Sequence, residues 1–157
     1  MKLSAGLLLF RIADDRVEVL LVHMGGPFWA RKDEHAWSVP KGEYEPGEDP
    51  ADAAVREFTE ELGTTPPGGP NLDLGSARQS GKTVTVFARE GDFDATAAVS
   101  NSFSLEWPPH SGRFQDFPEV DRAEWFDLPT AATKLVKGQI AFLTRLASRL
   151  AGGRPAP

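Results

Sequence analysis

The chain has 157 residues and a mass of 17.1 kDa, with 40% hydrophobic and 25% charged residues; this composition excludes a disordered chain and suits one domain, which we place at 1–151. It contains no cysteine, which excludes disulfide frameworks, thiolate zinc sites and cysteine nucleophiles and permits a reducing compartment, so we expect a cytoplasmic protein. The net charge of −6 argues against general nucleic-acid binding, which depends on a basic surface.

Two apolar runs at the start of the chain, 3–12 and 17–22, predict neighbouring β-strands joined by a short polar turn. Charged residues follow the first run at once, and it is shorter than the ~20 apolar residues that span a bilayer, so we expect neither a signal peptide nor a membrane helix. Residues 23–35 mix glycine, charged and aromatic residues, which is typical of a loop. A short strand is predicted at 36–39, where Pro40 ends it.

The most strongly patterned segment predicts a helix over 50–62. Asp49 is a suitable N-cap, Pro50 suits the first helical position, and Gly63 supplies the left-handed residue that commonly ends a helix. Apolar residues recur at helical spacing, so one stripe of this helix is expected to be buried: Ala51, Ala54, Val55, Phe58 and Leu62.

The second half of the chain predicts several strands and two further helices. In order, we expect a loop at 64–70, strands at 71–78, 82–89 and 103–107, an irregular mobile loop at 110–118, a strand at 120–126, a helix that begins after Asp127, and an amphipathic helix at 139–150. The glycine- and proline-rich tail, 152–157, is expected to be disordered. This order of elements indicates an α/β protein with a mixed sheet.

The acidic residues are concentrated in one segment: eight acids and one base lie between positions 43 and 61, which leaves the rest of the chain at +1. Glu57, Glu60 and Glu61 have helical spacing and project from one arc at the edge of the buried stripe. Each pair of like charges there costs about 0.2–0.5 kcal/mol. One interpretation is a solvated acidic face on which Arg56 pairs with Glu60. The position at the edge of the buried stripe favours a second interpretation, a cation site.

Three carboxylates without histidine or thiolate suit a hard divalent ion, Mg²⁺ or Mn²⁺. Mg²⁺ is commonly shared with substrate phosphates, and such an ion polarises a phosphoryl oxygen and produces hydroxide from bound water. The cluster therefore indicates metal-assisted hydrolysis of a phosphate ester or anhydride.

The segment from Gly42 to Thr64 resembles the signature of the Nudix hydrolases. After Gly42 come five residues, then Glu48, then seven residues, and then the run Arg56-Glu57-Phe58-Thr59-Glu60-Glu61-Leu62-Gly63-Thr64. Every fixed glycine, arginine and glutamate of the pattern is present; Thr64 departs from it, because the family usually has an aliphatic residue there. The resemblance implies a Nudix-type α/β/α sandwich with a mixed β-sheet between helices.

The resemblance also implies roles for these residues. Glu57, Glu60 and Glu61 match the family's metal ligands, and the carbonyl of Gly42 commonly adds another. Glu48 matches the glutamate that pairs with the signature arginine, Arg56, and so orients the catalytic helix. The implied reaction is attack of water on phosphorus in a nucleoside diphosphate linked to another moiety.

Residues before the signature are candidates for binding the substrate. Aromatic side chains can stack on a base and cations can hold phosphates, which selects Trp29, Arg31, Lys32, Trp37 and Lys41. Lys41, next to the signature, is the foremost phosphate candidate, whereas Trp37 is as well explained by a place in the core.

Members of the family often use one more carboxylate from outside the signature. Glu106 is the first candidate, because it ends a predicted strand beside an irregular loop, and Glu119 is the second. The alternative for each is an ordinary surface acid. His110 lies in a turn and is better explained by solvent exposure than by acid–base work.

The motif Trp-Ser-Val-Pro-Lys-Gly at 37–42, with Glu119-Val120, is similar to diadenosine polyphosphate hydrolases. The expected partner is therefore a small nucleotide or pyrophosphate compound, with diadenosine tetraphosphate as the leading candidate. Nucleoside triphosphates, sugar nucleotides and diphosphoinositols remain alternatives, as does a non-catalytic module that senses a nucleotide. A homodimer is left open.

Overall fold

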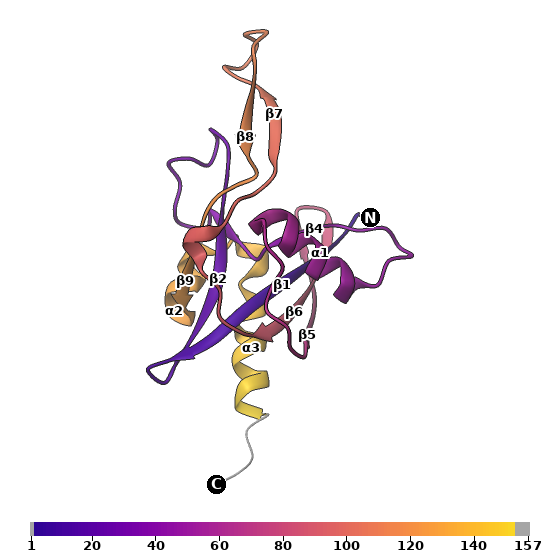
Figure 1. Cartoon of the computed structure of the whole chain (residues 1–157), viewed down its shortest axis with the longest axis vertical. Helices are drawn as coiled ribbons and strands as arrows, with labels where there is room; N and C mark the ends of the chain where they lie inside the picture. Colours follow the sequence, from indigo (N-terminus) through magenta and orange to yellow (C-terminus); the bar gives the residue numbers. More distant parts are fainter. Residues whose placement is uncertain (1, 153–157) are drawn as a thin grey trace.

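The structure is a computed structural model that describes residues 2–152 (Figure 1). Its centre is a sheet in which the strands run in the order β3-β2-β1-β6-β5, with β4 also beside β1 and β9 also beside β2. The pairing of β1 with β6 is parallel and the other pairings are antiparallel, so the sheet is mixed, as predicted. Its strands are β1 Lys2–Ala13, β2 Arg16–Met24, β3 Trp37–Ser38, β4 Lys41–Glu43, β5 Leu72–Gln79, β6 Lys82–Glu90 and β9 Val120–Asp127.

Helices cover both faces of this sheet, which gives the predicted α/β/α sandwich. Helix α1, Pro50–Leu62, packs on one face; α2, Leu128–Lys134, and α3, Ala141–Gly152, pack on the other. Short 3₁₀ turns at Ala95–Ala97 and Lys137–Gln139 complete the helical elements. Residues 4–10 of β1 are buried on both faces of the sheet, which explains the apolar run in the middle of this strand.

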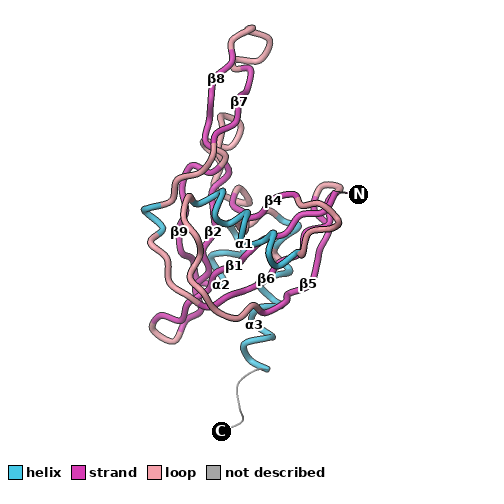
Figure 2. Tube along the Cα trace, turned by 45° about the vertical axis from the view of Figure 1, so that its right-hand side comes forward, coloured by secondary structure: helices cyan, strands magenta, loops and turns pink. Residues whose placement is uncertain are grey.

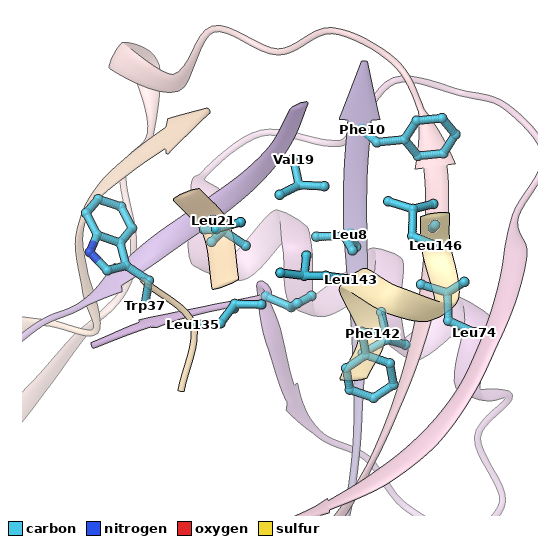
Figure 3. Packing of buried hydrophobic residues seen from close by; sticks show 14 of the residues in the cluster. Leu8, Phe10, Val19, Leu21, Trp37, Leu74, Leu135, Phe142, Leu143 and Leu146 are labelled. Atoms are coloured by element: carbon cyan, nitrogen blue, oxygen red, sulfur yellow. The ribbon is translucent and has the colours of Figure 1, made fainter. Parts of the chain in front are cut away.

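Two apolar clusters form the core, one on each side of β1. Leu8 and Phe10 point into the cluster that holds α2 and α3, which Figure 3 shows together with Trp37 and Phe142. The alternate residues of β1 point the other way and pack with the buried stripe of α1: Ala5, Leu7 and Leu9 against Ala53, Ala54, Phe58 and Leu62.

Helix α1 begins and ends where the sequence predicts. The side chain of Asp49 accepts a hydrogen bond from the N–H of Asp52 at 3.1 Å, and Gly63 takes the left-handed conformation with φ of 79°. These caps and the buried stripe fix the rotation of the helix, so that its glutamates lie against β4.

The prediction of an irregular mobile loop at 110–118 is wrong over most of its length. Phe114–Pro118 forms strand β8, which pairs with β7, Ser102–Glu106. This hairpin, which we call the arm, projects from the sheet in Figures 1 and 2. Strand β8 has the sequence Phe-Gln-Asp-Phe-Pro, which does not alternate between polar and apolar residues, and so the usual strand pattern is missing there.

Other differences from the expected elements are small. Strand β4 was not predicted, because it is only three residues long and forms by pairing with residues 4–6 of β1. Gly152 is the last residue of α3, and 153–157, part of the tail expected to be disordered, lie outside the described residues. Within 2–152, no helix has the length and apolar content needed to cross a bilayer.

The N-cap gives a test of how α1 is held. We expect Asp49→Ala to lower the free energy of unfolding by about 1 kcal/mol, because the N–H of Asp52 loses its acceptor. Asp49→Asn keeps an acceptor oxygen and is expected to unfold like the wild type. Urea denaturation measures both, and equal stability of the alanine and asparagine variants would contradict the assignment.

Candidate active site

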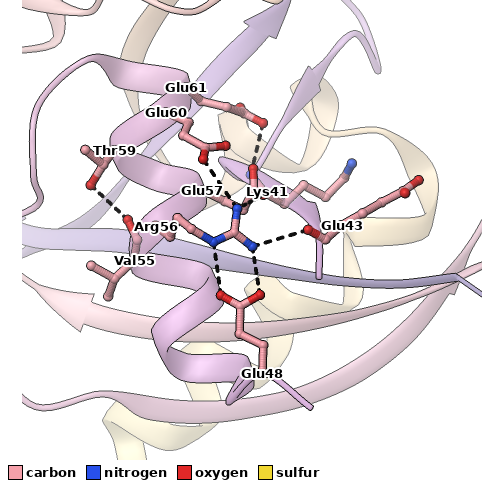
Figure 4. A network of polar contacts seen from close by, with 9 residues as sticks. All are labelled: Lys41, Glu43, Glu48, Val55, Arg56, Glu57, Thr59, Glu60 and Glu61. Carbon is pink, nitrogen blue, oxygen red and sulfur yellow. Dashed lines mark hydrogen bonds and ion pairs between the residues drawn. The ribbon is translucent and has the colours of Figure 1, made fainter. Parts of the chain in front are cut away.

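Arg56 organises the polar side of α1 through a bidentate ion pair with Glu48. Its Nε donates to Glu48 Oε2 at 3.0 Å and its Nη2 donates to Glu48 Oε1 at 2.9 Å (Figure 4). Nη2 also lies 3.4 Å from the carbonyl oxygen of Glu43. The hydrogen bonds from Arg56, and then its charge, lower the pKa of Glu48, and the paired geometry connects the acidic segment before the helix to the helix itself. The structure thus brings together the two residues that the signature pairs.

The same guanidinium reaches the glutamates further along α1. Its Nη1 donates to Glu57 Oε1 at 2.7 Å and lies 3.4 Å from Glu60 Oε1. Glu57 is buried, whereas Glu60 is exposed. Burial, and then the charge of Glu60, raise the pKa of Glu57, and these two effects outweigh the opposing effect of Arg56.

Glu61 is the most strongly perturbed of the three carboxylates. Burial raises its pKa to about 8, and the charges of Glu57 and Glu119 add to that rise. The charge of Lys41 and its backbone N–H, which donates to Glu61 Oε1 at 3.3 Å, act in the opposite direction. A desolvated carboxylate beside other carboxylates is typical of functional sites.

Gly42 permits the close contact between β4 and α1. A Cβ atom at this position would lie 1.9 Å from Glu57 Oε2, so that no other residue fits without displacing the carboxylate. Because Gly42 has no side chain, the backbone of β4 lies directly against the carboxylate of Glu57.

The chemistry of these donors fits a hard divalent ion. Three carboxylates crowd one turn of helix, and in two of them the pKa is raised, so that a cation would relieve the repulsion. Within residues 2–152, no three acidic or histidine side chains already converge as a ligand set. Arg56 engages Glu57 and Glu60, and the backbone of Lys41 engages Glu61.

Lysine side chains adjoin the cluster on the opposite face of β4 from α1. Lys41 of β4 pairs with Gly6 of β1, and Figure 4 shows its side chain running beside that of Glu43, away from the helix. The pKa of Lys41 is lowered by burial and by the nearby charge of Lys82. The hydroxyl of Ser4, buried on the same face, has no hydrogen-bond partner.

Lys82 was not predicted as a site residue, because its position near Lys41 depends on the order of the strands in the sheet. Lys82 begins β6 and pairs in parallel register with Lys2, and its Nζ lies 3.9 Å from Glu43 Oε1. The sequence separates it from the signature by many residues. Only the parallel pairing of β1 with β6 brings it beside the site.

The loop at 25–35 carries three of the predicted substrate residues. The ammonium of Lys32 lies 5.2 Å from the ring centre of Trp29, and Arg31 is exposed. Trp37, by contrast, is fully buried, and its Nε1 donates to Asp33 Oδ1 at 2.9 Å. The prediction that Trp37 contacts substrate is therefore wrong; it belongs to the core.

The structure separates the two candidates for an additional carboxylate. Glu106 ends β7 in the projecting arm, far along it from α1, and its Oε1 accepts a hydrogen bond from the N–H of His110 at 3.0 Å. Glu119 lies at the root of the arm, close enough to raise the pKa of Glu61. The geometry thus favours Glu119 over Glu106. His110 is exposed, with φ of 61° in the turn of the arm.

Comparisons with known proteins agree with this architecture. A family model described as NUDIX domain matches residues 2–146. The bis(5'-nucleosyl)-tetraphosphatase [asymmetrical] of Caenorhabditis elegans is 39% identical over 62 residues, which are 40% of this chain and 41% of that protein. The match therefore spans about two fifths of the length of that relative.

Solved structures share the fold at low sequence identity. A C. elegans Ap4A hydrolase binary complex has a TM-score of 0.61 at 23% identity, covering 97% of this chain and 99% of that one. The NUDIX domain of Shewanella oneidensis NrtR, complexed with ADP ribose, has a TM-score of 0.61 at 16% identity, covering 94% and 87%. Because the family model covers nearly the whole described chain, from β1 into α3, this protein belongs to the NUDIX domain family.

Proposed function

We propose that this chain is a Mg²⁺- or Mn²⁺-dependent hydrolase that cleaves a phosphoanhydride bond in a nucleotide derivative. The observation that carries the proposal is the row of Glu57, Glu60 and Glu61 on one side of α1, with Glu57 against the backbone of Gly42 and Glu61 accepting a hydrogen bond from the N–H of Lys41. A dinucleoside polyphosphate such as diadenosine tetraphosphate is the preferred substrate; the local similarity to the C. elegans tetraphosphatase supports this choice.

The carboxylates of Glu57, Glu60 and Glu61, with the carbonyl of Gly42, would hold the metal ion. When bound, such an ion polarises a phosphoryl oxygen and makes water a stronger acid. Arg56 holds the carboxylates of Glu57 and Glu60 through its Nη1 atom, and Glu48 fixes Arg56 in turn.

The remaining chemistry falls to side chains that surround the cluster. Lys41 and Lys82 supply positive charge for the phosphate chain, and Trp29 with Lys32 offers an aromatic face and a cation near the loop surface. As the water oxygen bonds to phosphorus and the bridging oxygen leaves with its electron pair, the carboxylate of Glu119 accepts the water proton.

The proposed activity is tested with a panel of diadenosine tetraphosphate, ATP, ADP-ribose and a diphosphoinositol, with Mg²⁺ added. We expect turnover to be fastest for the dinucleoside polyphosphate and Glu61→Gln to lower kcat about a hundredfold or more, because a buried ligand charge is lost. Product identification in ¹⁸O-labelled water locates the cleaved bond. Stable nucleotide binding without turnover would favour a sensing module instead.

Glu119 and Glu106 can be distinguished by matched substitutions. We expect Glu119→Gln to lower kcat by about a hundredfold, since the proton acceptor is lost, and Glu106→Gln to retain activity, since that side chain lies in the arm. Steady-state kinetics measures both. A loss of activity in Glu106→Gln with normal kinetics in Glu119→Gln would reverse the assignment.

The pKa of Glu61 predicts an unusual dependence of stability on pH. Because the pKa is raised from 4.5 to about 8, the folded state holds the Glu61 proton more tightly than the unfolded state does. The stabilisation is complete below pH 4.5 and is lost as pH rises through about 8. Without metal, Glu61→Gln is thus expected to melt above the wild type at pH 9 and alongside it at pH 4.

Magnesium should reverse this order, because an ion that binds only the folded state raises its stability. At pH 8, added Mg²⁺ is expected to raise the Tm of the wild type and to leave that of Glu61→Gln unchanged. Differential scanning calorimetry with and without chelator measures both. Parallel curves for the two proteins at every pH and Mg²⁺ concentration would contradict the role given to Glu61.

Gly42 offers a steric test of the same site. The methyl group of Gly42→Ala would meet Glu57 Oε2 at 1.9 Å, so the carboxylate must move. We expect loss of the Mg²⁺-dependent rise in Tm, a fall in kcat of about a hundredfold, and destabilisation of about 1–3 kcal/mol from overpacking. Gly47→Ala is the control, because no atom lies within 4 Å of a Cβ there. Wild-type kinetics in Gly42→Ala would refute the assignment.

A further inference from the structure

His23 is a completely buried polar side chain near the end of β2, outside the carboxylate cluster. Its Nε2 lies 2.6 Å from the carbonyl oxygen of Lys32, and its Nδ1 lies 2.8 Å from Asp121 Oδ1. The ring also packs edge-on against Trp37, with 5.1 Å between the ring centres. Both nitrogens are thus engaged, one by the loop at 25–35 and the other by β9.

Both partners of the ring are hydrogen-bond acceptors. A carbonyl oxygen only accepts, so Nε2 donates to Lys32. A second proton lies between Nδ1 and Asp121, because two lone pairs do not form a hydrogen bond. His23 therefore joins the loop to β9 through two satisfied contacts, in a place where an unsatisfied polar group is costly.

Asp121 is the extra residue of a β-bulge. His23 pairs with Arg122 of β9, but the next residue of β2, Met24, pairs with Val120, so that Asp121 has no residue opposite it. Bulges of this kind turn side chains toward a new face. Here Val120 and Ala123 both pack in the cluster beneath α1, whereas strict alternation from Ala123 would send Asp121 there.

The bulge also affects the direction of Glu119, which lies two residues before Asp121. Glu119 follows the arm and accepts a hydrogen bond on its carbonyl oxygen from the N–H of Gly25 at 2.9 Å, while its own N–H donates to the carbonyl of Asn101 at 2.8 Å. A shift of the bulge by one residue would exchange the faces taken by Val120 and Glu119. The direction of the Glu119 carboxylate thus depends on where Asp121 is fixed.

We propose that His23 and Asp121 are positioning residues whose hydrogen-bonded pair locks the β9 bulge and the Lys32 carbonyl, and so aims Glu119 at the reacting phosphate. The inference rests on the proposed function, because it assigns Glu119 a reaction to serve. The lock itself is a property of the fold and can be measured without substrate.

Three variants test the lock. Asp121→Ala removes the contact to His23. Asp121→Asn keeps both hydrogen bonds, because its amide donates to Nδ1 of a neutral imidazole while Nε2 still donates to Lys32. Asp116→Ala is the matched control, since it removes an exposed aspartate from β8 of the arm. Full-length protein is used throughout, with kcat and KM for diadenosine tetraphosphate and amide hydrogen exchange as readouts.

We expect Asp121→Ala to lower kcat about ten- to a hundredfold, with KM changed less than about threefold, because a displaced Glu119 affects chemistry more than binding. Exchange at the Gly25 amide should become at least about tenfold faster, since its acceptor is the Glu119 carbonyl. The Leu7 amide, which donates to Pro40 O at 3.1 Å, should stay unchanged. Asp121→Asn and Asp116→Ala should remain within about threefold of wild type in both readouts.

The inference is overturned by unchanged exchange at Gly25 in Asp121→Ala, or by a kcat equal to that of Asp116→Ala. It is also overturned if Asp121→Asn behaves like Asp121→Ala, because hydrogen bonding would then not be what matters. If the wild type turns over no member of the substrate panel while Gly25 exchange still responds, the proposed function fails and the lock stands.

Discussion

The site depends on one guanidinium that holds a strongly acidic stretch of chain together. Without Arg56, the segment from 43 to 61 would place only like charges along one side of α1. Arg56 contacts Glu48, Glu57 and Glu60 at once and also approaches the backbone of Glu43. Glu61 lies beyond these contacts, and its burial, with a smaller contribution from the charges of Glu57 and Glu119, raises its pKa to about 8.

Helix α1, the apolar strands of the sheet and the signature residues could be predicted because each follows from a pattern within one short stretch of sequence. Asp49, the apolar stripe and Gly63 fix α1 within a single stretch of sequence, and the continuous apolar run of β1 follows from burial on both faces. The family resemblance likewise rests on one contiguous segment. Such features need no knowledge of what packs against them.

The features that were not predicted depend on contacts between distant segments. Lys82 comes near Lys41 only through the parallel pairing of β1 with β6, and the preference for Glu119 over Glu106 appears only once the arm and the bulge of β9 are placed. The sequence left Trp37 open between substrate contact and the core; the hydrogen bond to Asp33 and the packing of Phe126 place it in the core. Strand β8 does not alternate between polar and apolar residues, because it pairs only with β7 in the arm and most of its side chains face solvent.

The long parallel register of β1 with β6 also determines when the site can form during synthesis. The glutamates of α1 leave the ribosome before 82–90, yet β6 lies beside β1 in the middle of the sheet on which that helix rests. Pairings between residues so far apart in the chain form slowly, since a long loop must close first. Leu7 and Leu9 of β1 can already cover the apolar stripe of α1 at that stage, but Lys82 approaches Glu43 only after β6 has been translated and has paired with β1. The acidic side of the site therefore forms before its second lysine arrives.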